Sequence, residues 1–199
     1  MSSRAVGVRG VLRGAGSVGL ALAVGAWTSG GRGRELDERA FRALNRERGP
    51  GVDAALRGIT ELGSIWASVG GAAVLALAGR RRAAAQGLAA AGAAWLAGQG
   101  LKRVFRRPRP YESDRGATRL RIHPPRASSW PSSHPAVLLA FVSAAGRELE
   151  PPALGRLGLR ALAGAVGVSR TYLGVHSPAD VVGGLLVGRG VAAVLDGRR

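Results

Sequence analysis

Long uncharged stretches alternate with short arginine-rich segments along this 199-residue chain. A bilayer core requires about 20 mostly apolar residues per helix, within a range of about 17 to 25. Four stretches meet this requirement: residues 14 to 31, 62 to 79, 83 to 101 and 127 to 146. Pro131 interrupts the last stretch, so its helix is predicted to start near His134 or Pro135. The pattern therefore predicts several membrane-spanning helices.

Two further stretches, residues 153 to 169 and 178 to 195, are apolar but carry arginines. Arginine side chains near a helix end can extend to the membrane interface, so these stretches remain acceptable as spans. Together the six stretches predict an all-α fold, a polytopic membrane helical bundle of about six transmembrane helices. Alanine and glycine lower the hydropathy of every stretch but favour close helix packing in lipid.

The first apolar stretch also has features of a secretory signal, because arginines precede it. A cleavage site of the A-x-A kind is not evident before Arg32, which favours a retained first helix over a cleaved signal. The length suits one domain with a sizeable core and leaves little room for a second. We expect a single membrane domain over residues 1–199, with a motif-bearing core over residues 84–196.

The formal net charge of +17 is typical of proteins that bind nucleic acid or anionic membrane surfaces. The 46% hydrophobic fraction decides between these classes, because it is segregated into uncharged stretches, whereas a soluble basic domain would intersperse its charges. We therefore expect a membrane partner and no nucleic acid. The charges leave orientation open, because the short turn at residues 80–82 and the arginine-rich segments 32–57 and 102–126 favour opposite answers. The oligomeric state is also left open.

The residue types present exclude several kinds of chemistry. The chain has no cysteine, which excludes disulfides, thiolate metal sites and a cysteine nucleophile. Its three histidines, His123, His134 and His176, are not accompanied by an HExxH motif or a cluster of paired aspartates, and no P-loop appears. We therefore expect no metal ion or other cofactor.

Three separated motifs carry the residue types of a phosphate-handling site. They are K-x6-R-P from Lys102 to Pro110, P-S-S-H from Pro131 to His134, and S-R-x5-H-x3-D from Ser169 to Asp180. In a six-span arrangement the first motif follows the third span, the second precedes the fourth, and the third joins the fifth to the sixth. All three motifs are therefore predicted to emerge on one membrane face, as segments that act on one substrate must.

Phosphoryl transfer requires cations around the phosphate oxygens, an in-line nucleophile and a proton donor for the leaving oxygen. Three cationic side chains can clamp the phosphate: Lys102, Arg109 and Arg170. His176 can attack phosphorus if Asp180 accepts a hydrogen bond from its other ring nitrogen. His134 then remains as the general acid. Pro135 suits the first turn of a helix, so backbone N–H groups of residues 132 to 134 can face an anion.

The same motifs have plainer structural interpretations. The spacing of Ser177 and Asp180 is that of a helix capping box. Three arginines of the first motif are expected to anchor a helix end in lipid headgroups: Arg103, Arg106 and Arg107. His123 has no partner at motif spacing and is interpreted as a loop residue. The occurrence of all three motifs in order favours the chemical interpretation over coincidence.

These motifs resemble those of the type 2 phosphatidic acid phosphatase superfamily, which also contains bacterial acid phosphatases and vanadium haloperoxidases. The family pattern is KxxxxxxRP, PSGH and SRxxxxxHxxxD, and the match covers residues 102 to 180. The resemblance implies a phosphohistidine at His176, which Asp180 orients, and protonation of the leaving group by His134. It implies five phosphate-binding residues: Lys102, Arg109, Ser132, Ser133 and Arg170.

The resemblance also implies a helical bundle with an acid phosphatase/vanadium haloperoxidase-like core. For bacterial members in the plasma membrane it implies an active site that faces outward. Ser133 stands where the family has glycine. If the site needs only the backbone N–H of this residue, activity survives, whereas the added side chain could crowd the oxyanion or demand a different backbone angle. We expect an active enzyme.

The leading hypothesis is a metal-independent phosphatase that hydrolyses a lipid phosphate or diphosphate, phosphatidate-like or polyprenyl, reached from the bilayer. Vanadate-dependent halide oxidation on the same scaffold is an alternative that the short, membrane-bound chain disfavours. A non-enzymatic cationic membrane protein that binds anionic lipid or nucleic acid is a second alternative, and the intact motif residues disfavour it. The sequence leaves the substrate headgroup and tail undetermined.

Overall fold

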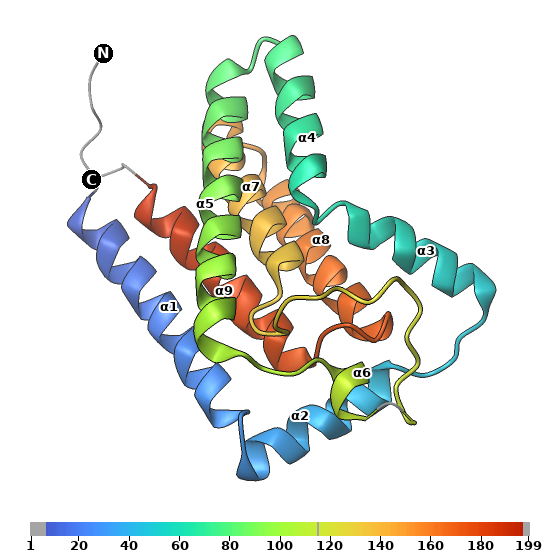
Figure 1. The fold of residues 1–199 in the computed structure, drawn as a ribbon. Helices are drawn as coiled ribbons and strands as arrows, with labels where there is room; N and C mark the ends of the chain where they lie inside the picture. Colours follow the sequence, from blue (N-terminus) through green and yellow to red (C-terminus); the bar gives the residue numbers. More distant parts are fainter. Residues whose placement is uncertain (1–6, 115, 197–199) are drawn as a thin grey trace.

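The computed structural model describes residues 7–114 and 116–196, and every regular element within them is helical (Figure 1). The helices run in the order α1 (Val8–Trp27), α2 (Gly31–Leu44), α3 (Pro50–Glu61), α4 (Ile65–Leu77), α5 (Arg81–Phe105), α6 (Pro110–Ser113), α7 (Ser133–Leu149), α8 (Ala153–Tyr172) and α9 (Pro178–Val194). The predicted domain 1–199 also includes residues 1–6, 115 and 197–199, which lie outside the described residues. The all-α prediction is confirmed.

Six of these helices coincide with the six apolar stretches of the sequence: α1, α4, α5, α7, α8 and α9. α7 begins at Ser133, one residue before the predicted start at His134. Ser132 precedes it in an extended conformation, and Pro135 occupies the first turn, where a missing backbone N–H removes no helical hydrogen bond. The local sequence therefore accounts for where α7 starts.

Fewer helices are long and apolar enough to cross a membrane by themselves than the six apolar stretches predicted. Within the described residues, α1 is the one helix long and apolar enough to cross a bilayer by itself, with a hydropathy of 1.3. α3 and α4 meet the same requirement together, but the chain bends by 65° at the break between them. Arginines and small residues lower the hydropathy of the other long helices, as Arg156 and Arg160 do in α8.

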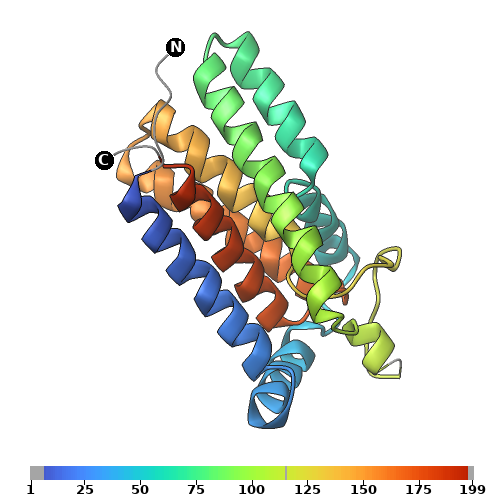
Figure 2. The same cartoon turned by 60° about the vertical axis from the view of Figure 1, so that its left-hand side comes forward.

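Small residues let the central helices approach closely. α7 lies beside α5 and α9, and α1 lies beside α9 (Figures 1 and 2). A Cβ atom added at Gly188 of α9 would lie 2.4 Å from the carbonyl oxygen of Ala136 in α7. Four alanines of α5 and α7 are buried together: Ala90, Ala94, Ala140 and Ala144. This packing needs no large side chains and holds the start of α7 against α9.

Two helices that the apolar stretches did not predict, α2 and α3, lie between α1 and α4. α2 buries Gly33, Asp37 and Phe41, which are four residues apart and therefore share one face of the helix. That face packs against the ends of α1, α8 and α9, and α2 crosses below them in Figure 1. A polar aspartate at the centre of a buried helix face requires bonded partners.

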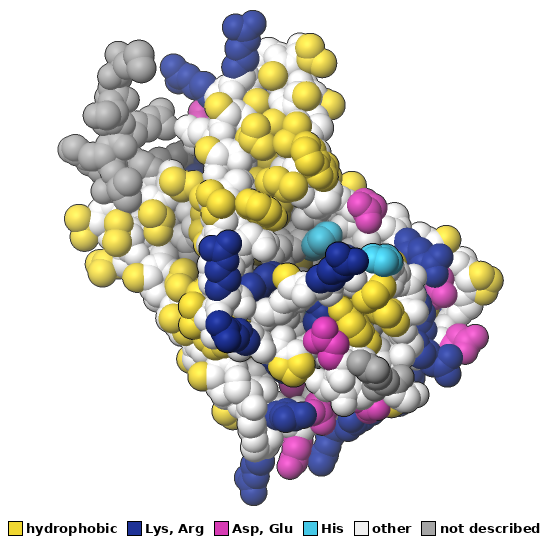
Figure 3. All heavy atoms as spheres, in the orientation of Figure 1, with side chains coloured by type: hydrophobic (Ala, Val, Ile, Leu, Met, Phe, Trp, Pro, Cys, Tyr) yellow, Lys and Arg dark blue, Asp and Glu magenta, His cyan; other side chains and the backbone are white. Residues whose placement is uncertain are grey.

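Hydrophobic side chains gather on the surface of α1, α4 and α5, whereas charged side chains gather over α2, α3 and α6 at the lower end (Figure 3). Large apolar side chains are exposed on several of the long helices, among them Trp66 and Leu77 of α4 and Leu154 of α8. Exposed apolar surface of this extent is typical of helices that face lipid.

Candidate active site

The structure brings the three sequence motifs together at one end of the helical bundle. The first motif ends α5, the second begins α7, and the third ends α8 and begins α9. The backbone N–H of Ser132 donates to the carbonyl oxygen of Asp180 at 2.9 Å, which joins the second motif to the third. Arg109 Nη1 lies 3.3 Å from His176 Nε2, which joins the first to the third. The motifs therefore lie together at one end of the bundle, which agrees with the order of the apolar stretches.

The start of α9 positions the catalytic candidates of the third motif. Pro178 occupies the first helical position, and Ser177 and Asp180 form a capping box in which the Asp180 carboxylate accepts the Ser177 N–H at 2.8 Å. The plainer interpretation of this spacing is therefore correct. The same carboxylate also faces His176, so one side chain caps the helix and borders the imidazole.

The three predicted phosphate-binding cations donate hydrogen bonds to uncharged oxygen acceptors. Lys102 Nζ donates to the carbonyl oxygen of Ser128 at 2.9 Å, and Arg170 Nη1 donates to Thr60 Oγ1 at 3.2 Å. Arg109 donates to the carbonyl oxygens of residues 127 and 175 at 2.7 and 2.8 Å. Within residues 7–114 and 116–196, none of the three forms a salt bridge, although nearby carboxylates add favourable charge: Glu61 at Arg170, Asp180 at Lys102 and Arg109, and Glu112 at Arg109. We call Lys102, Arg109 and Arg170 the cation cluster.

Several buried polar atoms beside the cation cluster have no hydrogen-bond partner within the described protein. Four of them belong to predicted site residues: Ser132 Oγ, Ser133 Oγ, Arg170 Nε and His176 Nδ1. Nδ1 of His176 faces Asp180 at 3.5 Å. Buried polar atoms are normally paired, so the other three mark a place where a polar ligand gains hydrogen bonds. The Ser132 N–H was expected to face an anion, but it is bonded to Asp180, so only residues 133 and 134 keep N–H groups for that role.

His176 lies between the cation cluster and Asp180 and is almost completely buried. A guanidinium can only donate hydrogen bonds, so the contact with Arg109 requires a lone pair on Nε2 and places the ring proton on Nδ1. Nδ1 lies 3.5 Å from Asp180 Oδ2. Burial lowers the pKa of His176 well below its usual value, and the charges of Lys102 and Arg109 lower it further. The imidazole is therefore neutral, as a nucleophile must be.

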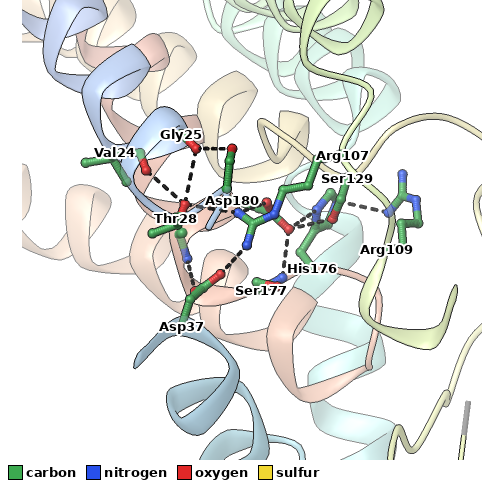
Figure 4. Close-up of polar contacts among 12 residues, drawn as sticks. Val24, Gly25, Thr28, Asp37, Arg107, Arg109, Ser129, His176, Ser177 and Asp180 are labelled. Atoms are coloured by element: carbon green, nitrogen blue, oxygen red, sulfur yellow. Dashed lines mark hydrogen bonds and ion pairs between the residues drawn. The ribbon is translucent and has the colours of Figure 1, made fainter. Parts of the chain in front are cut away.

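Arg107 has a different role from the one expected from the sequence. It was predicted to anchor a helix end in lipid headgroups, but its guanidinium lies between two buried carboxylates (Figure 4). Nη1 donates to Asp180 Oδ1 at 3.0 Å, and Nη2 donates to Asp37 Oδ2. Ser129 Oγ donates to the other oxygen of Asp180. The side chains of Asp37, Arg107, Ser129 and Asp180 form what we call the carboxylate network.

Residues 60 to 63 form a wall of the site that motif reasoning missed. Thr60 is buried against Arg170. A Cβ atom added at Gly63 would lie 2.8 Å from His134 Cβ and 2.9 Å from the His134 carbonyl oxygen. The break between α3 and α4 therefore packs directly on His134, at the start of α7. Nothing in a short motif signals such a contact, because it joins segments far apart in the chain.

The remaining predicted residues are placed as follows. His134 occupies the first turn of α7 and is partly buried. His123 is exposed in the loop between α6 and α7, as expected, and Arg103 and Arg106 are exposed. A Cβ atom added at Gly98 of α5 would lie 3.1 Å from the Ser133 hydroxyl. Gly98 therefore leaves room for the side chain of Ser133, the residue that stands where the family has glycine.

The site motifs fall inside a stretch that matches a known family model. The model of the PAP2 superfamily matches residues 82–195. The decaprenylphosphoryl-5-phosphoribose phosphatase of Mycobacterium tuberculosis is 32% identical over 150 residues, which cover 74% of this chain and 80% of that protein. The match extends beyond the motifs to most of both chains.

Two solved structures have a similar fold. The transmembrane PAP2 type phosphatidylglycerolphosphate phosphatase of Bacillus subtilis superposes with a TM-score of 0.74 at 22% identity, covering 93% of this chain and 94% of that one. LpxE of Aquifex aeolicus superposes with a TM-score of 0.72 at 24% identity, covering 80% of this chain and 94% of that one. At this identity the two structures establish the likeness of fold.

Proposed function

Because this chain belongs to the PAP2 superfamily and is a phosphatase that acts on lipid phosphates, we propose that it works through a phosphohistidine on His176, without a metal ion. The family match confirms the resemblance that the three motifs predicted. The observation that carries the proposal is the position of the His176 ring, with Nε2 against Arg109 of the cation cluster and Nδ1 facing Asp180.

The proposed reaction has two steps. When the phosphate binds, the guanidinium of Arg109 bonds to its oxygens and releases the lone pair on His176 Nε2. Nε2 forms a bond to phosphorus while the bond from phosphorus to the lipid alcohol oxygen breaks, and His134 donates a proton to that oxygen. A water molecule then forms a bond to phosphorus while the bond from phosphorus to Nε2 breaks, and the water gives a proton to His134. Inorganic phosphate leaves, and both imidazoles return to their starting states.

The cation cluster supplies the positive charge that this reaction requires. Negative charge on the phosphate oxygens is stabilised by fixed cations that need no reorganisation during the reaction. Asp180 holds the proton on Nδ1 and stabilises the ring as it becomes positively charged. The residues present thus cover each role in phosphoryl transfer.

The test of this proposal is phosphate release by the purified protein in detergent with a chelator present. We expect turnover of a lipid phosphate monoester, no turnover by His176→Ala, and a labelled, acid-labile phosphoenzyme from the wild type alone. The proposal is wrong if turnover requires an added divalent metal, or if His176→Ala releases phosphate at the wild-type rate.

For the substrate, we propose a polyprenyl-linked sugar phosphate, and a phosphatidate-like lipid is the competing candidate. The relative that supports this choice is named as a decaprenylphosphoryl-5-phosphoribose phosphatase. A screen of polyprenyl phosphate, polyprenyl-linked sugar phosphate, phosphatidate and lysophosphatidate decides between them. A higher kcat/KM for phosphatidate than for both polyprenyl substrates would contradict the choice.

For the membrane, we propose six spans formed by α1, α4, α5, α7, α8 and α9, with the active site on the outer face of a bacterial plasma membrane. The chain has no cysteine, so single introduced cysteines report topology without background. Ala117 is exposed in the segment after α6, near the site, and Ala78 is exposed at the end of α4 away from the site. Each is replaced by cysteine in a separate variant. We expect an impermeant maleimide to label the first in intact cells and the second only after lysis. The reverse pattern would place the site inside.

A further inference from the structure

Arg107 connects three parts of the chain that are far apart in sequence. Its guanidinium bonds to Asp180 at the start of α9, to Asp37 in the middle of α2, and to the hydroxyl of Thr28 after α1 (Figure 4). The side chains of Asp37 and Asp180 are 3% and 0% exposed, so both carboxylates depend on bonded partners in place of water.

Asp37 also holds the start of α9. Its Oδ1 accepts a hydrogen bond from the backbone N–H of Ala179 at 2.8 Å. N–H groups in the first turn of a helix have no backbone acceptor within that helix, so a side chain of α2 supplies the acceptor here. Burial raises the pKa of Asp37, whereas the Ala179 N–H and Arg107 both oppose that effect. Asp37 therefore bonds both to the Arg107 guanidinium, which holds Asp180, and to the first turn of α9, which carries Asp180.

The two oxygens of Asp180 are held from different sides. Oδ2 accepts Ser129 Oγ and the Ser177 N–H and faces Nδ1 of His176, while Oδ1 accepts Arg107 Nη1. Arg107 thus fixes the rotation of the carboxylate about its last bond, which sets where Oδ2 lies relative to the imidazole. A change of a few tenths of an ångström there alters the orientation of the ring.

We propose that Asp37 and Arg107 are positioning residues of the phosphatase reaction: they fix the Asp180 carboxylate, and through it the ring of His176. The inference rests on the proposed function, because it assigns Asp180 the role of orienting the nucleophile. It makes α2, which lies outside the three motifs, part of the machinery that determines turnover.

The plainer alternative is that the pair only docks α2 onto the bundle. The two roles differ in what they change. Docking alters stability and leaves the rate of the folded enzyme intact, whereas positioning lowers kcat in protein that remains folded. Neither residue touches the cation cluster in the described structure, so a positioning role leaves phosphate binding unchanged.

The experiment compares two conservative variants with a matched control. Asp37→Asn keeps an oxygen for the Ala179 N–H but presents N–H groups to Arg107. Arg107→Lys keeps the charge but loses the planar guanidinium, whose two separate nitrogens contact the two carboxylates. Arg103→Lys makes the same change on an exposed arginine of the same motif. The measurements are kcat, KM and the inhibition constant of inorganic phosphate, all on protein checked for thermal unfolding.

We expect each conservative variant to lose about 10- to 100-fold in kcat, because a misplaced reacting group costs up to about 100-fold, with KM and the phosphate inhibition constant unchanged. Arg103→Lys retains wild-type kcat. The double variant Asp37→Asn with Arg107→Lys falls no further than the worse single variant, because both act through Asp180.

Three outcomes would overturn the inference: wild-type kcat in both folded single variants, a rise in the phosphate inhibition constant equal to the loss of activity, or strictly additive losses. If Asp37→Asn does not fold, Arg107→Lys alone decides the question by the same criteria. Failure of the proposed function looks different, because the wild type itself would then release no phosphate by a histidine-dependent route.

Discussion

The two sides of the His176 ring are constructed in opposite ways. On the Nε2 side, the cation cluster rests on uncharged oxygens, and buried hydroxyls beside it lack partners among the described residues. On the Nδ1 side, the carboxylate network pairs Arg107 with two carboxylates, and donors reach both oxygens of Asp180. The first side gains bonds when an anion arrives, whereas the carboxylates of the second side already have their donors.

This difference separates binding from orientation. A fixed surplus of positive charge stabilises a phosphate and its transition state, and it works best when no protein carboxylate competes for it. A satisfied network resists movement, because breaking one of its bonds leaves a buried charged group with a hydrogen bond unmade. Changes on the Nε2 side should therefore affect substrate affinity and rate together, and changes on the Nδ1 side should affect rate alone.

The largest expected effect is removal of the residue that the two sides share. His176→Ala should lower kcat by about 1,000-fold or more, because no other group can form the phosphoenzyme. Measurement is by phosphate release and by trapping of labelled phosphoenzyme, with the inhibition constant of phosphate as a check that the cation cluster is intact. Retention of the phosphoenzyme in this variant would assign the nucleophile to another residue.

A smaller loss is expected from a change confined to the Nε2 side. Arg109→Lys should lower kcat/KM by about 100-fold, because a single ammonium cannot reach both backbone carbonyls and a phosphate oxygen. The phosphate inhibition constant should rise in parallel, in contrast to Arg107→Lys. Equal inhibition constants in the wild type and Arg109→Lys would show that the cation cluster does not bind phosphate.

A further test concerns the wall of the site formed by residues 60 to 63, which belongs to neither side of the His176 ring. Gly63→Ala should lower kcat by about tenfold and stability by about 1 to 3 kcal/mol, because the new methyl group displaces the backbone of His134. Gly70→Ala in α4 is the control, since nothing lies within 4 Å of a Cβ there. Similar activity in the two variants would mean that the start of α7 tolerates the displacement.

The smallest effect is a pH dependence of stability. The pKa of His176 is lowered in the folded protein, so below the usual value of 6.5 the unfolded chain binds a proton that the folded chain does not. Stability then falls as the pH drops below this value, by up to about 1.4 kcal/mol per pH unit, and is regained as the pH rises. Thermal unfolding of the wild type and His176→Gln across this range measures the difference. Identical pH dependences would contradict a buried neutral His176.

The sequence located the cation cluster and both histidines because these residues lie in motifs with fixed local spacing. It also predicted that the motifs lie on one side, because in the predicted six-span arrangement consecutive spans alternate in direction. It assigned Arg107 wrongly and missed Asp37. A basic residue beside a helix end has the same sequence pattern whether it meets lipid headgroups or a carboxylate 70 residues away. The spacing of Gly33, Asp37 and Phe41 was the one available signal, since it places an aspartate on a buried helix face.

What the sequence predicted by itself is the chemistry: residue types and short spacings indicate which groups would bind a phosphate, attack it and donate a proton. The all-α class follows from it as well, because apolar stretches of helical length leave few other choices. Only the tertiary structure decided which carboxylate pairs with which arginine, and that α2 and the break before α4 border the site. These contacts join segments distant in the chain, and their energies depend on burial and on distance in three dimensions, which no local pattern encodes.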